Sequence, residues 1–121
     1  MNRKTEGGAI RRMMASPDVV IGSVCAVTHA GSLIAVSASG SQLPAYAGGA
    51  GQLILVVGAQ KIVPDLAAAM RRIESYVLPL ETERTKRVYG VPSAVSEILI
   101  INRDYSAART TIILIKQAIG F

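Results

Sequence analysis

The sequence predicts an α/β fold in which helices pack on one mixed sheet of about five strands. Two runs of apolar residues, 53–57 and 98–101, are typical of strands that are buried on both faces. A largely helical stretch separates them, so we expect a parallel central pair joined by a right-handed crossover. A last strand at 111–115 follows closely enough to form an antiparallel hairpin with 98–101.

A second hairpin is predicted near the start of the chain. Residues 19–27 and 33–36 are rich in β-branched side chains, and Gly31 in the turn between them can adopt a positive φ. His29 lies in the same turn. We interpret it as an exposed turn histidine, because no partner nearby in the sequence supports a role as ligand or base.

Helical segments are predicted on both sides of the run at 53–57. The first is small, with Ser39 or Ser41 as its cap, Pro44 in its first turn and Gly48 at its end. The second begins at Pro64, and Pro79 is expected to end it and to start another. Apolar residues spaced by four, three and four positions should face the sheet. They are Leu66, Met70, Ile73 and Val77.

Composition limits the possible functions of the chain. It has 121 residues and a net charge of +5, but the basic residues are dispersed and only 4% of residues are aromatic, so we do not expect nucleic-acid binding. The single cysteine, Cys25, excludes an intramolecular disulfide and a four-cysteine iron–sulfur or zinc site. We therefore expect no metal and no cofactor in this chain.

Hydropathy bears on location and assembly. No apolar run approaches the roughly 20 residues that span a bilayer, and residues 1–12 lack the apolar core of a signal peptide, so we expect a cytoplasmic protein that is not bound to a membrane. We expect residues 1–15 to be a mobile arm, with one helical turn after Gly8, and residues 16–121 to form one α/β domain. The mean hydropathy of +0.40 indicates apolar surface that meets another subunit, in a homodimer or larger homo-oligomer.

The candidate ligand-binding residues lie in three loops that should share one edge of the sheet. The first loop leads into a helix N-terminus, where free N–H groups could bind an anion or could simply be capped. Lys61 follows the strand at 53–57, at the edge where open α/β sheets bind ligands, and is either a phosphate or carboxylate ligand or a solvated loop lysine. The candidates are Ser39, Gly40, Ser41, Gln42, Lys61, Asn102 and Arg103.

Several stretches of the chain share a pattern with a known family. They are residues 22–33, 40–47, 56–66, 71–74, 78–81 and 100–103. The most specific is Gln-Lys-Ile-Val-Pro-Asp-Leu at 60–66. Together these stretches resemble the lactate-utilisation (LUD) domain family over nearly all of residues 16–121, as a short or amino-terminally truncated member.

The resemblance implies a fold of the sugar-phosphate-isomerase and CoA-transferase-like kind. It also implies a part in the oxidation of L-lactate to pyruvate, together with iron–sulfur oxidoreductase partners that would carry the clusters. It implies no catalytic mechanism. Two positions differ from the family pattern: His29-Ala30 stand where an acidic pair is common, and Cys25 stands where a more polar residue is usual.

Three functional hypotheses follow. The first is an accessory or non-catalytic LUD-type domain in a lactate-oxidation system. The second is a binding module or enzyme for a phosphorylated or acyl-CoA ligand, held by Lys61, Arg103 and the loop at 39–42. The third is a structural domain that serves only for association.

Overall fold

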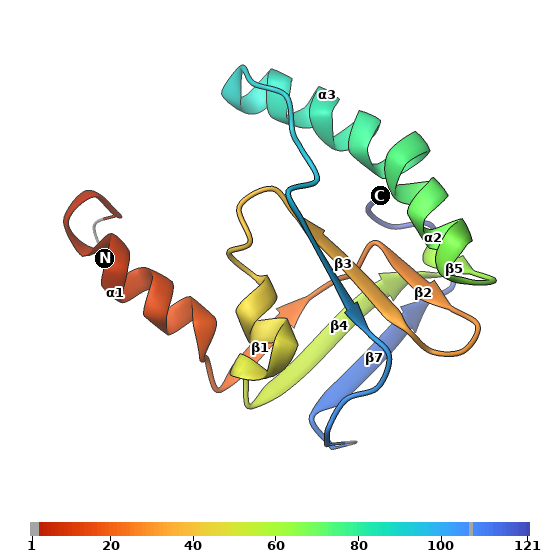
Figure 1. Ribbon diagram of the computed structural model, residues 1–121, viewed down its shortest axis with the longest axis horizontal. Coiled ribbons are helices and arrows are strands. Elements are labelled where there is room, and N and C mark those ends of the chain that lie inside the picture. Colours follow the sequence, from red (N-terminus) through yellow and green to blue (C-terminus); the bar gives the residue numbers. More distant parts are fainter. Residues whose placement is uncertain (1–2, 107) are drawn as a thin grey trace.

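The computed structural model describes residues 3–106 and 108–121 and shows two sheets with helices around them (Figure 1). The α/β class is confirmed. The single sheet of five strands is wrong, because the strands divide into a parallel sheet of three and a mixed sheet of four. In the part of the chain that is described, no helix has both the length and the apolar content that crossing a membrane requires.

The parallel sheet is built around one buried strand. Its order is β1, β4, β7, and both outer strands run parallel to β4. The side chains of Leu53, Leu55 and Val57 in β4 are completely buried, which confirms the central strand predicted there. The strands are β1 (Val19–Gly22), β4 (Gln52–Gly58) and β7 (Thr110–Ile115).

The mixed sheet has the order β5, β2, β3, β6. Its strands β2 and β3 are antiparallel, as expected for the hairpin predicted near the start of the chain. β6 is an edge strand that runs antiparallel to β3. Its side chains alternate, so that Leu99 packs against the core whereas Ile98 is 45% exposed. The prediction that this strand is buried on both faces is therefore wrong. The strands are β5 (Ile62–Val63), β2 (Ala26–Thr28), β3 (Leu33–Ser37) and β6 (Glu97–Ile101).

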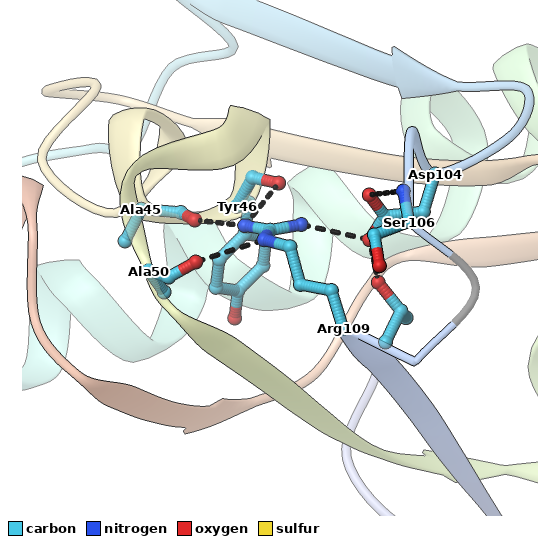
Figure 2. Close-up of polar contacts among 7 residues, drawn as sticks. Ala45, Tyr46, Ala50, Asp104, Ser106 and Arg109 are labelled. Carbon is cyan, nitrogen blue, oxygen red and sulfur yellow. Dashed lines mark hydrogen bonds and ion pairs between the residues drawn. The ribbon is translucent and has the colours of Figure 1, made fainter.

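The partners of β6 and β7 differ from the predicted ones. The parallel pair of 53–57 with 98–101 is wrong, and so is the hairpin of 98–101 with 111–115, because β7 joins β4 in the other sheet. The guanidinium of Arg109 explains this pairing. It donates to carbonyls of Ala45 and Ala50, just before β4, and so fixes the start of β7 beside that strand (Figure 2).

The predicted strand at 19–27 is two strands in two sheets. The chain turns between them at Gly22 and Ser23, where the Ser23 N–H donates to the Tyr46 hydroxyl at 3.1 Å and that hydroxyl donates to the Ser23 carbonyl at 3.0 Å. A Cβ on Gly22 would collide with the same hydroxyl. Glycine at position 22 therefore allows the tyrosine from a distant helix to break the strand.

The helices largely follow the predictions. A helix, α1 (Arg3–Ala15), replaces the single turn predicted within the arm, and it extends away from the sheets (Figure 1). The small helix η1 (Ala45–Gly49) lies where a helix was predicted, but the predicted cap at Ser39 or Ser41 is wrong, because Pro44 takes the N-cap position and the two serines bond to each other. In α2 (Leu66–Arg72), the Asp65 carboxylate caps the first turn by accepting from the Ala68 N–H at 2.8 Å.

The long helical stretch does not break at Pro79. A π-helical turn, η3 (Ile73–Val77), connects α2 directly to α3 (Leu78–Tyr89), and Pro79 sits in the first turn of α3. Ile73 and Val77 are buried as predicted, whereas Leu66 is exposed, because it lies in the first turn of α2 at the margin of the sheet.

Candidate functional site

A cavity of about 310 Å³ lies between the β2–β3 hairpin, the end of η3 and the segment before β6. Its wall is mostly apolar and includes Val24, Val36 and Val77. A few polar side chains interrupt this wall, as is typical of small-ligand sites. They are Ser23, Cys25, Ser37, Gln42, Lys61, Glu81 and Ser93.

Lys61 carries the only ammonium group among the described residues that line this cavity. It ends the short helix η2 (Ala59–Lys61) directly after β4, and the residue is only 6% exposed, so the interpretation as a solvated loop lysine is wrong. Its Nζ donates to the Ser23 hydroxyl at 3.1 Å. Within the described residues, it has no carboxylate within ion-pair distance.

The electrostatic environment of Lys61 disfavours its charge. Burial is the main cause that lowers the pKa of the ammonium, a charged Cys25 thiolate would raise it, and the nearby Arg72 guanidinium lowers it by a smaller amount. Burial also raises the pKa of the Cys25 thiol, so this thiol stays neutral and does not serve as a counterion. Lys61 is therefore a buried amine whose charge lacks compensation by an acidic side chain.

Ser23 is held firmly as the partner of Lys61. Its backbone exchanges two hydrogen bonds with the hydroxyl of Tyr46, which is buried in the core, and this burial raises the pKa of the tyrosine. The Ser23 hydroxyl is thereby fixed at the end of β1, within reach of Lys61. Ser23 was not among the predicted site residues; the only signal for it in the sequence is Gly22-Ser23 within a β-branched run.

The last described residues pass over Lys61. The Gln60 amide donates to the carbonyl of Ile119 at 2.6 Å, and the Arg72 guanidinium donates to the carbonyls of Cys25 and Phe121. A Cβ added to Gly120 would lie 3.4 Å from the Lys61 amine. This segment therefore contributes to the burial of Lys61, and Figure 1 shows the end of the chain beside α2.

The loop at 37–42 places one of its predicted residues in the cavity. Gln42 lines the wall, where its amide donates to the Val36 carbonyl at 3.3 Å and its oxygen accepts from the Ser37 hydroxyl at 3.0 Å. Ser39 and Ser41 point into solvent and bond to each other at 3.2 Å. Gly40 has a φ of 77° and packs against Glu97. These three residues are placed to shape the turn.

Asn102 and Arg103 lie away from the cavity. Ser37 pairs with Glu97 at one end of the β3–β6 ladder, whereas Leu33 pairs with Ile101 at the other end. Asn102 follows Ile101 at the end of the ladder far from Ser37, and its side-chain oxygen accepts from the Ser32 hydroxyl at 3.0 Å. The expected single edge for all three loops is therefore wrong, because β6 runs antiparallel to β3 instead of parallel to β4.

A second cation, Arg109, is only partly buried, with 12% of its side chain exposed, and is held in a different way. Its guanidinium donates to the carbonyls of Ala45, Tyr46 and Ala50 and forms an ion pair with Asp104 at 2.8 Å (Figure 2). A hydrogen bond from the Thr110 hydroxyl, followed by those from Arg109, lowers the pKa of Asp104. All three nitrogens of the Arg109 guanidinium donate within the fold, so this cluster is structural.

Metal binding finds no support in the geometry. Among the residues that the structure describes, no three His, Cys, Asp or Glu side chains gather closely enough to hold an ion.

Comparison with known proteins identifies one family. The model of the LUD domain family matches residues 2–115 of the 121-residue chain. The curated proteins and the solved structures gave no significant match.

Proposed function

Since the chain belongs to the LUD domain family, we propose that it is an accessory domain of a system that oxidises L-lactate to pyruvate. In this role it binds a short organic acid and performs no redox step by itself. The sequence has a single cysteine, so the iron–sulfur clusters of such a system belong to partner oxidoreductases. A free thiol at Cys25 is compatible with a reducing compartment, and we propose the cytoplasm.

The buried Lys61 carries the ligand-binding part of this proposal. A carboxylate in the cavity would supply the negative charge that the surrounding side chains do not, and it would accept a charge-assisted hydrogen bond from Nζ. The Ser23 hydroxyl lies beside the same position, and the apolar wall suits the methyl group of lactate or pyruvate. A cavity of about 310 Å³ is at the small end for ligand sites, which favours a small acid.

A phosphorylated or acyl-CoA ligand is less well supported. Such a ligand needs several cations around its phosphates. Arg103, which the second hypothesis required, lines other hollows at the opposite end of the mixed sheet. The Arg72 guanidinium already donates to two backbone carbonyls.

Isothermal titration calorimetry tests the proposal. We expect L-lactate and pyruvate to bind, and lactamide, which keeps the shape without the carboxylate, not to bind. Lys61→Gln should weaken binding about 10- to 100-fold, since a hydrogen bond to a charged group contributes about 1.5–3 kcal/mol. Lys86→Gln, at an exposed site on α3, is the matched control. Equal binding of lactamide, or full binding by Lys61→Gln, would overturn the proposal.

We also propose that a second copy of the chain covers the open strands. β6 and β7 each end a sheet, and both expose apolar side chains, among them Ile98, Ile100, Ile113 and Leu114. Apolar side chains exposed along an edge strand favour association with another chain. Association through these strands would produce the homodimer or larger assembly that the hydropathy predicts.

A further inference from the structure

The amine of Lys61 has the placement that covalent chemistry needs. Its Nζ lies against the cavity, and its one hydrogen bond in the structure goes to the neutral Ser23 hydroxyl at 3.1 Å. Glu81 is the carboxylate that lines the same cavity, but its oxygens accept from the Arg84 guanidinium at 2.5–3.1 Å. The charged Lys61 amine therefore has N–H groups available to a ligand, and the neutral amine has its lone pair available.

The surroundings of Lys61 favour the nucleophilic, neutral form. Burial lowers its pKa, with a smaller contribution from Arg72 and against the opposing effect of Cys25, so more of the amine is unprotonated near neutral pH than for a lysine in water. Such desolvated lysines are the ones that react with carbonyl groups. Cys25, the other nucleophile in the cavity wall, keeps its proton because burial raises its pKa.

We propose that Lys61 forms a reversible imine with the carbonyl carbon of a 2-oxo acid. This inference rests on the proposed function, because it assigns the ligand class of the same cavity. The Nζ lone pair attacks the carbonyl carbon, and one amine proton moves to the carbonyl oxygen to give a carbinolamine. The second amine proton leaves with that hydroxyl as water, and the C=N bond forms. No oxidant or reductant is needed.

The Ser23 hydroxyl relays the protons in these transfers. It lies 3.1 Å from Nζ, and the Tyr46 hydroxyl fixes its backbone from both sides. It can accept a proton from nitrogen while it donates its own to the departing oxygen. The chemistry also separates the two acids of a lactate system, because pyruvate has a carbonyl carbon and lactate has only an alcohol.

Reductive trapping tests the inference. The full chain is incubated with pyruvate and sodium cyanoborohydride, and the adduct is measured by intact mass and located by peptide mapping. We expect one adduct per chain, on Lys61. It should be lost in Lys61→Arg and kept in Lys86→Arg, and Ser23→Ala should slow trapping by at least about tenfold. Lactate should give no adduct.

The outcomes separate this inference from the proposed function. No adduct, or equal labelling of Lys61, Lys86 and Lys116, would overturn the imine. Lactate binding measured by calorimetry on the same preparation would still support the proposed function in that case. An adduct on Lys61 without lactate binding would support the imine and overturn the lactate site. Mapping on the wild-type chain keeps the test decisive even where Lys61→Arg does not fold.

Discussion

Lys61 is a buried cation and Arg109 a largely buried one, yet the surrounding residues compensate their charges to very different degrees. Arg109 donates to three backbone carbonyls and pairs with Asp104. Lys61 donates to one hydroxyl and borders a cavity. A buried charge is tolerated when hydrogen bonds and a counterion compensate for its desolvation. The first cation therefore stabilises the structure, whereas the second is available to a ligand.

The largest effect should come from removing the compensated cation. Arg109→Met removes the counterion of Asp104 and the side-chain donor to three carbonyls, so we expect a loss of about 3–5 kcal/mol in the free energy of unfolding. Urea denaturation followed by circular dichroism measures it. Arg87→Met, which removes an exposed ion pair with Glu83, should change stability by less than about 0.5 kcal/mol. Equal effects of the two variants would contradict the comparison.

The turn that positions Ser23 should be the next most sensitive point. Gly22→Ala forces a Cβ against the Tyr46 hydroxyl, and we expect a loss of about 1–3 kcal/mol. Adding Tyr46→Phe removes the clashing oxygen. The double variant should therefore lose less stability than the sum of the two single variants. Strict additivity in urea denaturation would show that the two residues do not meet.

Assembly should depend on the open edge of the parallel sheet. Ile113→Lys places a charge on the exposed face of β7, and we expect it to shift the protein to a monomer without loss of secondary structure. Light scattering at micromolar concentration measures the mass. A wild-type protein that is already monomeric would contradict the proposed association.

A smaller effect should come from the titration of Lys61. The pKa of Lys61 is lower in the folded state, so between that pKa and the ordinary value of about 10.4 the unfolded state binds more protons and stability rises with pH. Cys25 and Tyr46 have raised pKa values and act in the opposite direction there. The difference between wild type and Lys61→Met isolates the lysine. As pH rises, the free energy of unfolding of the wild type should increase relative to that of Lys61→Met.

Asp104 should respond at the acidic end of the range. Its pKa is lowered in the folded state, so its contribution is complete above the ordinary value of about 3.9 and is lost as pH falls through the folded pKa. Thr110→Val removes the hydrogen bond that contributes most to this shift. Denaturation of this variant should therefore depend less steeply on acid pH than that of the wild type.

Local signals in the sequence were sufficient for much of the fold. The apolar run of β4 and the turn at Gly31 depend on neighbouring residues, and the structure contains each as expected. The helix predicted from Pro64 also forms, but it begins at Leu66, and Asp65 is its cap. The partners of β6 and β7 depend on contacts between distant segments, above all those of Arg109 with Ala45 and Ala50. No local pattern contains that information.

The candidate site shows the same division. Lys61 and Gln42 were found because they follow strands, and they do share one cavity. Asn102 was misplaced together with the strand that precedes it. The burial of Lys61 was not foreseen, because it depends on Ser23 and on the segment that includes Gly120, which lie far from it in the sequence.

The titration of the Lys61 side chain shows whether this buried amine lacks a counterion and is free to bind an acid. Its ¹³Cε resonance, assigned by its absence from Lys61→Gln, reports the protonation of Nζ as pH is raised. We predict a midpoint below the value of about 10.4 for a free lysine, and an upward shift of that midpoint when lactate is added. A midpoint at or above the free value, unmoved by lactate, would contradict the account.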